Sequence, residues 1–247
     1  MPVTISIIIP TYNHRVALEK CLANIAVQTF RDFEVIVVDD GSTDGTNEWL
    51  QAMKNHELGI RNYGKDLPDS LFIIHNSSNK GAPAARNAGL QKAKGEYILF
   101  CDADVVMQPN MLQKMYDALQ AHPEASYAYS SFTFGWKKFI LWPFDGEKLQ
   151  RMPYIHSTSL IRRVHFPKVG WDESLKRLQD WDLFLTMLEE GHTGVWIPDI
   201  LLTITVRRGG ISNWLPSFLY KFPFLPSVKK YKAAESIVRK KHKISML

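Results

Sequence analysis

The sequence predicts an α/β fold, a single domain with a mainly parallel central sheet and helices on both faces. Three short apolar segments, residues 4–9, 33–38 and 97–101, are each followed by polar residues, which is typical of buried parallel strands. Segments with helical periodicity lie between them, so strands and helices alternate along the chain. With 247 residues, 45% of them hydrophobic, the chain is long enough for one such core.

The first half of the chain divides into alternating elements. The strand at residues 4–9 precedes a helix predicted over residues 15–28, where apolar residues recur at near-helical spacing. The strand at residues 33–38 precedes a helix that extends to residue 53. Ser42 or Thr43 is expected to cap this helix, and Asp44 to favour its positive end.

The next segments continue the same alternation. Residues 56–70 are polar and contain glycines and a proline, which predicts a loop insertion before a short strand at residues 71–74. A helix is expected over residues 82–94, ended by Gly95. After the strand at residues 97–101, a further helix is expected over residues 111–121, between Pro109 and Pro123.

The cysteines and the N-terminus indicate the compartment. Cys21 and Cys101 both lie in apolar stretches, so we interpret them as small core residues, which suits a reducing environment. The chain passes from Met1 and Pro2 directly into a strand, without the features of a signal peptide. The expected location is therefore cytoplasmic, with peripheral contact at the inner face of the cell membrane as an open interpretation.

The C-terminal part of the chain is strongly basic. Residues 207–247 contain ten lysines and arginines and one acid, Glu235, so this segment carries +9 while the whole chain carries +5. Residues 211–228 are rich in aromatic side chains but contain three prolines and Lys221, which excludes an ordinary membrane-spanning helix. We divide the chain at this point into a domain at residues 1–206 and a basic extension at residues 207–247.

Two interpretations of the extension are equally favoured by the sequence. An aromatic stretch followed by lysines fits a segment that lies on an anionic bilayer. A core-packed aromatic segment followed by a solvated basic helix fits as well. Nucleic acid is the weaker third possibility, because no nucleic-acid motif accompanies the charge, and we expect no nucleic-acid partner.

Polar residues at strand ends indicate a site. Asp102 and Asp104 follow the strand at residues 97–101, and Asp39 and Asp40 follow the strand at residues 33–38. Open α/β sheets bind ligands at the carboxyl ends of their parallel strands, so we expect these loops to converge. Carboxylate oxygens are the ligands that Mg²⁺ and Mn²⁺ prefer, particularly beside a diphosphate.

Four segments, in this order, resemble the family 2 glycosyltransferases, which have the GT-A fold. The similarity covers residues 4 to about 206. The segments are Pro10-Thr11-Tyr12-Asn13, Val38-Asp39-Asp40-Gly41-Ser42-Thr43-Asp44-Gly45-Thr46, Asn79-Lys80-Gly81 with Ala85-Arg86-Asn87-Ala88-Gly89, and Asp102-Ala103-Asp104.

The resemblance implies an inverting transferase that uses a nucleotide sugar and a divalent cation, Mn²⁺ or Mg²⁺. It places donor binding in about residues 1–107 and the acceptor and base in about residues 108–206. It also implies that Asp39 reads the uracil ring of a UDP-sugar and that Asp104 ligates the metal. The residues implied in donor binding are Pro10, Thr11, Tyr12, Asp39, Arg86 and Asp102, of which Asp102 also contributes to the metal site.

Several of these residues keep an alternative interpretation. Asp40 points away from its neighbour Asp39 and is at least as well explained as a turn cap. Arg86 holds phosphate or sugar, or else anchors the Asp pair. Lys80 is a weaker candidate for the same phosphate contact.

Asp180 matches the general base of the family. It precedes an amphipathic helix, and Gln179 stands where the family usually has Glu, which removes a charge and is expected to lower the pKa of Asp180 relative to the Glu-bearing form. Asp182 lies two positions along the same helix and faces elsewhere, so we interpret it as a helix-start residue.

Four further features are assigned only as contacts. His156 lines the acceptor side or is a structural histidine. Arg207 and Arg208 occupy the place where relatives carry a diphosphate-binding His or Arg, and are expected to neutralise phosphate. The aromatic segment at residues 136–144 is acceptor surface, sheet core or membrane contact.

Three functions follow from these observations. The first is a metal-dependent inverting glycosyltransferase that acts on a carbohydrate or lipid-linked acceptor in polysaccharide or glycolipid synthesis. The second is a catalytically silent module that binds a nucleotide sugar, suggested by Gln179 and the missing loop histidine. The third is a sugar nucleotidyltransferase, which is disfavoured because residues 10–15 lack a glycine-rich phosphate loop.

Overall fold

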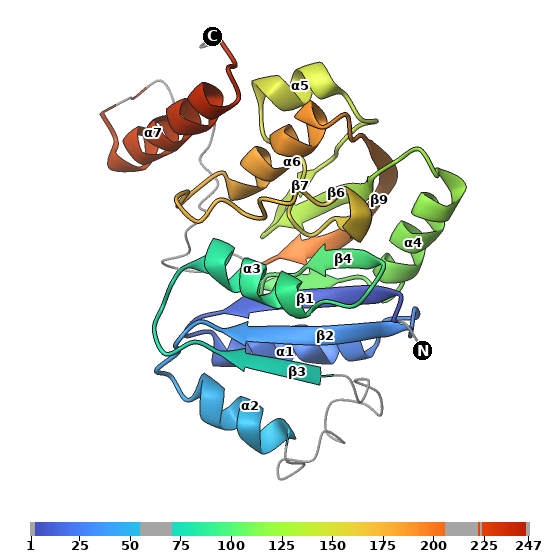
Figure 1. The fold of residues 1–247 in the computed structure, drawn as a ribbon, viewed down its shortest axis with the longest axis vertical. Helices are drawn as coiled ribbons and strands as arrows, with labels where there is room; N and C mark the ends of the chain where they lie inside the picture. Colours follow the sequence, from blue (N-terminus) through green and yellow to red (C-terminus); the bar gives the residue numbers. More distant parts are fainter. Residues whose placement is uncertain (1–2, 55–70, 206–221, 223, 246–247) are drawn as a thin grey trace.

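The computed structural model describes residues 3–54, 71–205, 222 and 224–245. Nine strands from these residues form one mixed sheet in the order β3-β2-β1-β4-β8-β6-β9-β5, with β7 paired to β6. Helices cover both faces of this sheet (Figure 1). The predicted α/β architecture is therefore confirmed.

The four strands of the first half are parallel to one another. They are β1 (Ile5–Thr11), β2 (Phe33–Asp39), β3 (Leu71–His75) and β4 (Tyr97–Phe100). β1, β2 and β4 are buried along their whole length, as their apolar composition predicts. Their carboxyl ends meet at one edge, on the left of Figure 1, so the polar residues that follow them lie together.

Two hydrophobic clusters, one on each face, attach the helices to the sheet. One cluster contains side chains from α1 (Arg15–Ala26), α2 (Thr46–Lys54) and α4 (Met111–Ala121). The other contains side chains from α3 (Ala82–Lys92), α5 (Gly146–Arg151) and α6 (Gln179–Glu189). Ile7 and Ile8 are neighbours in β1 and belong to opposite clusters, because successive side chains of a strand point to opposite faces.

The second half of the chain adds strands that the sequence analysis did not predict. β8 (Leu160–Arg162) is antiparallel to β4, and β6 (Tyr127–Phe134) is antiparallel to β8. β9 (Gly194–Ile204) then runs parallel to β6, while β5 (Val105–Met107) and β7 (Lys137–Phe139) form antiparallel edges. A short 3₁₀ helix, η2 (Arg163–His165), follows β8.

The start of α2 differs from the prediction. The helix begins at Thr46, and Asp44, rather than Ser42 or Thr43, accepts a hydrogen bond from the Thr46 N–H at 3.2 Å. Asp44 also accepts from the Arg15 N–H at 3.1 Å, at the first turn of α1. One carboxylate therefore satisfies free N–H groups at two helix starts, which a local capping pattern does not reveal.

Cys21 and Cys101 are free, buried thiols, as predicted for core residues. Their sulfur atoms lie 3.7 Å apart, although the two residues are 80 positions apart in the sequence. The predicted loop at residues 56–70 lies outside the described residues.

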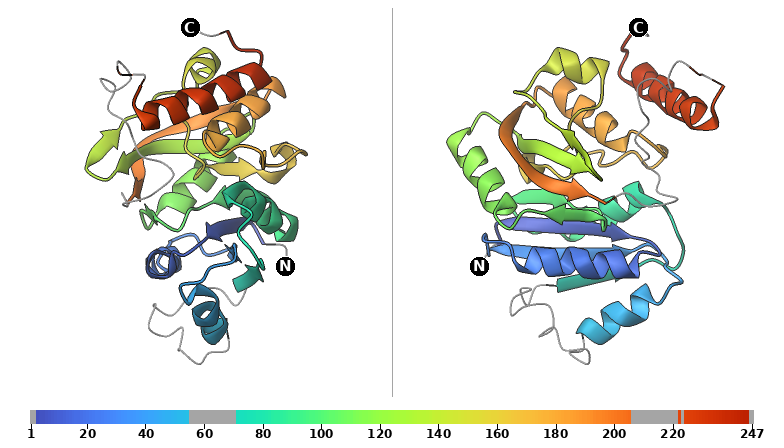
Figure 2. Two further views of the ribbon diagram at one scale, coloured as in Figure 1. Left: turned by 90° about the vertical axis from the view of Figure 1, so that its left-hand side faces the viewer. Right: turned by 180° about the vertical axis from the view of Figure 1, so that it is seen from behind.

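The last described helix, α7 (Pro226–Lys241), packs against the α6 side of the domain (Figure 2). Val228 and Val238 are buried, and the Arg239 side chain donates to the backbone carbonyl of Arg151 at 2.9 Å. Within the described ranges, no helix is long and apolar enough to cross a bilayer. Most of the aromatic segment at residues 211–228 lies outside these ranges.

Candidate active site

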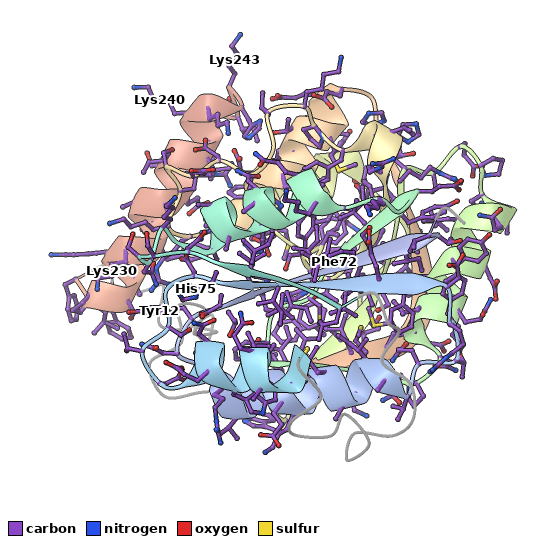
Figure 3. The ribbon with its side chains drawn as sticks, turned by 60° about the horizontal axis from the view of Figure 1, so that its bottom comes forward. Tyr12, Phe72, His75, Lys230, Lys240 and Lys243 are labelled. Atoms are coloured by element: carbon purple, nitrogen blue, oxygen red, sulfur yellow. The ribbon has the colours of Figure 1, made fainter. Side chains whose placement is uncertain are left out.

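Thr11, Asp39 and His75 occupy neighbouring positions at the carboxyl edge of the sheet. Thr11 is in register with Asp39 on β2, and Asp39 is in register with His75 on β3. The Asp39 carboxylate is buried; Oδ1 accepts from the Ser42 N–H at 3.1 Å, and Oδ2 lies 2.9 Å from His75 Nδ1. Figure 3 shows Tyr12 and His75 at this edge.

His75 is a member of this group that the sequence analysis missed. Its side chain is 39% exposed, so the ring links the buried Asp39 carboxylate to solvent. A sequence signal existed, because His75 is the polar residue that directly follows the apolar segment at residues 71–74. Asp39 and Asp102 follow their strands in the same way.

The loop after β1 is tied to the loop after β2. Asn13 has a positive φ of 53°, and its side-chain oxygen accepts from the Thr43 N–H at 2.7 Å. This turn leaves Tyr12 exposed, with 41% of its surface accessible. Thr11 is buried, and its hydroxyl has no hydrogen-bond partner within the described part of the chain, while Pro10 lies buried within β1. The Tyr12 side chain is therefore accessible to a ligand at this edge of the sheet.

Asp40 has a structural role, which supports its interpretation as a cap. It is buried and accepts hydrogen bonds from the N–H groups of Lys80 and Gly81 and from the Asn76 side chain. These contacts hold the segment that leads into α3. The Lys80 side chain is exposed, so only its backbone takes part in this network.

Arg86 joins the donor motifs to the predicted base. From the first turns of α3, its guanidinium donates to Asp102 Oδ1 at 2.7 Å and to Gln179 Oε1 at 2.8 Å. The group also lies over the Trp171 ring, with 4.6 Å between Cζ and the ring centroid. Only 7% of the Arg86 side chain is exposed. Arg86 thus anchors Asp102, the alternative that the sequence analysis left open.

Asp102 remains an ionised and reachable carboxylate. Burial opposes its ionisation, but the charge and the hydrogen bond of Arg86 outweigh this effect and lower its pKa. Its side chain is 34% exposed. Asp104 is partly buried, and its backbone carbonyl accepts from the Thr205 N–H at 3.0 Å, which ties the Asp motif to the end of β9.

The donor set of Asp102 and Asp104 fits a hard divalent cation. Among the described residues no cluster of three or more His, Cys, Asp or Glu side chains forms a complete metal cage. Mg²⁺ commonly binds through one or two carboxylates together with the phosphates of a substrate, so two carboxylates are a sufficient protein contribution. Arg207 and Arg208 follow Thr205 closely in the sequence but lie outside the described residues.

Asp180 and His156 interact electrostatically with each other and with Arg86. Burial raises the pKa of Asp180, and the charges of His156 and Arg86 oppose this shift. Burial also lowers the pKa of His156, although the carboxylates of Asp180 and Asp102 act in the opposite direction. His156 Nδ1 accepts from the Thr158 N–H at 3.0 Å, so the proton of the neutral ring is on Nε2.

The backbone before Asp180 is in an unusual conformation. Leu178 has a φ of 57°, in the left-handed region that branched and bulky residues rarely adopt. Such conformations concentrate at functional sites because the surrounding structure must hold them. Here the turn starts α6 so that the Gln179 side chain accepts a hydrogen bond from Arg86. Asp182, two residues after Asp180, instead contacts His242 at the end of α7, as expected of a residue outside the site.

The fold and this arrangement of carboxylates place the chain in a known class. A family model described as "Glycosyl transferase family 2" matches residues 6–171, so the chain belongs to glycosyltransferase family 2. GlyG, a glycosyltransferase of Streptococcus pneumoniae, is 34% identical over 116 residues, which cover 47% of this chain and 35% of GlyG. TuaG, a Bacillus subtilis protein named for teichuronic acid biosynthesis, is 25% identical over 227 residues, which cover 85% of this chain and 81% of TuaG.

Solved structures confirm the GT-A fold. The S. aureus TarS fragment 1–349 in complex with UDP superposes with a TM-score of 0.70 at 19% identity, over 96% of this chain and 65% of the fragment. Mannosyltransferase PcManGT from Pyrobaculum calidifontis, in complex with GDP-Man and Mn²⁺, superposes with a TM-score of 0.65 at 18% identity, over all of this chain and 77% of PcManGT. The chain thus spans about a third of GlyG and two thirds of the TarS fragment.

Proposed function

We propose that this protein transfers a sugar from a nucleoside-diphosphate sugar to an acceptor hydroxyl, with inversion at the anomeric carbon. The observation that carries the proposal is the double hydrogen bond of Arg86, which joins Asp102 at the end of β4 to Gln179 beside Asp180. This pair of contacts links the strand end that carries Asp102 to the helix start that carries Asp180. We expect a UDP-sugar as the donor and polysaccharide or glycolipid synthesis as the setting, which the resemblance to TuaG and TarS supports.

Donor binding is assigned to the strand ends. Asp39 is proposed to read the base through its remaining acceptor positions, with His75 holding the carboxylate, while Tyr12 covers the ring and the Thr11 hydroxyl provides an unused polar group. Pro10 shapes the same strand end. Asp102 and Arg86 lie on the ribose and phosphate side, where Lys80, Arg207 and Arg208 are additional cationic candidates.

Asp104 and Asp102 would hold a divalent cation, Mn²⁺ or Mg²⁺, and a Mn²⁺-bound structural neighbour supports this assignment. The cation would neutralise negative charge on the diphosphate of the donor. The chain's own cation, Arg86, remains paired with Asp102 and orients that carboxylate, so its charge is already compensated within the protein.

Asp180 is proposed to accept the proton of the acceptor hydroxyl. A carboxylate with a raised pKa is a stronger base than one in water, and burial supplies this effect for Asp180. The neutral His156 ring carries its proton on Nε2, interacts electrostatically with Asp180, and is proposed to orient the acceptor or the base. Gln179, being neutral, leaves the Arg86 charge available to Asp102.

A silent nucleotide-sugar-binding module is the second candidate. It is motivated by Gln179 in place of the usual Glu, and Arg86 uses this side chain as a neutral hydrogen-bond acceptor. Both candidates predict donor binding, but only the transferase predicts loss of turnover when the base is removed.

The test combines thermal shift with a transfer assay. Purified protein is screened against UDP-, GDP- and dTDP-sugars with Mn²⁺, Mg²⁺ or EDTA, and the bound donor is then followed for transfer to acceptors and for slow hydrolysis. Asp104→Ala is expected to abolish metal-dependent stabilisation by the donor. Asp180→Asn is expected to keep that stabilisation and to lower turnover by about 10²–10⁴-fold, the typical contribution of a general base.

Asp199→Asn is the matched control, because Asp199 is half exposed and pairs with Lys114 away from the site. It is expected to keep both donor binding and turnover. Donor binding without turnover in the wild-type protein would favour the silent module. Absence of stabilisation by every donor would overturn the proposal.

A further inference from the structure

The helix α7 and the turn that follows it carry several exposed lysines. Seven cationic side chains lie between residues 222 and 245, and two of them are engaged by the protein: Arg239 with Glu235 and Lys241 with Asp172 and Asp182. Glu235 is the single acid of this segment, and Arg239 neutralises it. The other five side chains are exposed and form no ion pair within the described residues: Lys229, Lys230, Lys232, Lys240 and Lys243.

Exposed apolar side chains accompany these lysines. Phe224 is 66% exposed, Phe222 is 44% exposed, and their ring centroids lie 5.9 Å apart just before α7 begins. Ile237, which is 56% exposed, shares the outward side of the helix with Lys230 and Lys240, as positions separated by seven and three residues do. The inner side is occupied, because Val228, Val238 and His242 are buried against the domain.

This surface, Phe222 and Phe224 with the five unpaired lysines, lies on the same side of the molecule as the candidate site. The carboxyl ends of β1, β2 and β3 and the helix α7 both lie toward the left of Figure 1 and toward the viewer in the left panel of Figure 2. In Figure 3, Lys230 projects near Tyr12 and His75, whereas Lys240 and Lys243 project at the other end of α7, farther from these two residues.

We propose that the outer face of α7, together with Phe222 and Phe224, binds the surface of an anionic lipid bilayer. Each lysine near such a surface is attracted by anionic head groups, and its apolar stem can lie along the interface. Aromatic rings and Ile237 enter the interfacial region, where apolar area adds to the electrostatic attraction. The lysine charges of this surface are complementary to the anionic head groups, and its exposed aromatic rings are complementary to the apolar interfacial region.

A duplex nucleic acid is less complementary to the same surface. Its phosphates would also attract the lysines, but two exposed phenylalanines gain little from a charged duplex backbone. The bilayer binding does not require the proposed transferase activity. If the protein also has the proposed transferase activity, membrane binding holds its candidate active site close to the head groups, where a lipid-linked acceptor would be found.

The test is flotation of the full chain with phosphatidylcholine vesicles, with and without phosphatidylglycerol. Binding is expected to the anionic vesicles alone and to weaken between about 0.05 and 0.5 M NaCl, because salt screens exposed charges. The triple variant K229E/K230E/K240E is expected to bind roughly 100-fold more weakly, from about 1 kcal/mol for each lysine removed. F222S/F224S is expected to weaken vesicle binding by roughly tenfold and to reduce the fraction of that binding that remains at high salt concentration.

The matched control is K20E/K92E/K168E, three exposed lysines on other parts of the surface. Both triple variants change the net charge from +5 to −1, because each Lys→Glu substitution subtracts two charges. The control is expected to retain most of the binding. The proposal would be overturned if both triple variants lost vesicle binding equally, or if the wild-type protein did not float with anionic vesicles. It would also be overturned if the protein bound duplex DNA more tightly than vesicles and F222S/F224S left that DNA binding unchanged. A thermal melt of every variant confirms that it is folded.

Discussion

His242 Nε2 lies 2.9 Å from Asp182 Oδ1, and this contact joins the end of α7 to the first turn of α6. Both side chains are almost fully buried, and His242 Nδ1 lies 2.9 Å from Glu189 Oε1 at the other end of α6. A ring with carboxylates at both nitrogens is a double donor, hence an imidazolium. The basic C-terminal helix is therefore held against the helix that carries Asp180.

The first prediction concerns the pH dependence of this contact. Burial opposes the charge on His242, but the hydrogen bonds to Asp182 and Glu189 outweigh it and raise its pKa. The stabilisation is thus fully present below the ordinary histidine pKa of 6.5 and is lost as the pH rises through the higher folded value. His242→Gln should therefore lower the free energy of unfolding by about 1.5–3 kcal/mol at acidic to neutral pH and by less in alkali.

Urea unfolding of the wild type and the variant across this pH range tests the prediction. His122→Gln is the control, because the His122 side chain is half exposed and pairs with an exposed Glu124. A constant difference between wild type and His242→Gln at all pH values would contradict the charged pair.

The second prediction concerns Arg86. Lysine carries one ammonium group and cannot reach Asp102 and Gln179 with the fork that Arg86 uses. Arg86→Lys is expected to lower the free energy of unfolding by about 1–3 kcal/mol, because at least one of these partly buried acceptors loses its charged donor. Donor affinity should fall with it, since Asp102 loses its orientation.

Chemical denaturation and donor titration measure the two effects. Arg151→Lys serves as the control, because Arg151 forms an exposed pair with Glu147 on α5 and should cost little. The proposed anchoring would be wrong if both substitutions had the same small effect.

The third prediction compares two glycines of the loop after β2. Gly41 and Gly45 have φ values of 78° and 80°, so an alanine is strained at either position. A Cβ at Gly41 would also lie 2.8 Å from the Ser78 carbonyl carbon, whereas nothing lies within 4 Å of a Cβ at Gly45. Gly45→Ala is expected to lower the free energy of unfolding by about 1–2 kcal/mol. Gly41→Ala is expected to lower it by more, because the backbone at Ser78 must also move.

Thermal and urea unfolding of the two variants give the comparison. Equal destabilisation by both substitutions would show that the loops after β2 and β3 do not approach as closely as 2.8 Å implies.

The fourth prediction concerns the two thiols. The hydrogen bond between Cys101 and Cys21 and the burial of the site both raise the pKa of Cys101, so its thiolate is scarce as well as inaccessible. A thiol reagent is expected to label neither cysteine in the folded protein and both in denaturant. Rapid labelling of the folded chain at either position would contradict the buried contact between Cys21 on α1 and Cys101 after β4.

Local patterns were sufficient for part of the fold. Residues 4–9 and 33–38 became buried parallel strands because consecutive β-branched residues suit a strand with both faces covered. β6, β8 and β9 were missed, since their pairings join residues far apart in sequence and one of them is antiparallel to β4. The Asp44 cap was missed for a related reason, because this residue satisfies N–H groups of two helices at once.

The sequence by itself determined which chemical groups gather at the carboxyl edge of the sheet, because polar residues after parallel strands must emerge at one edge. It therefore predicted Asp39, Asp102 and Asp104 as neighbours in one site. Only the tertiary structure decided which of these groups are engaged by the protein. Arg86 and His75 come from other elements, and their bonds to Asp102 and Asp39 depend on how α3 and β3 pack. The hydrogen-bond partner of a side chain depends on which elements pack against each other in the folded structure, and the spacing of residues along the chain does not specify this packing.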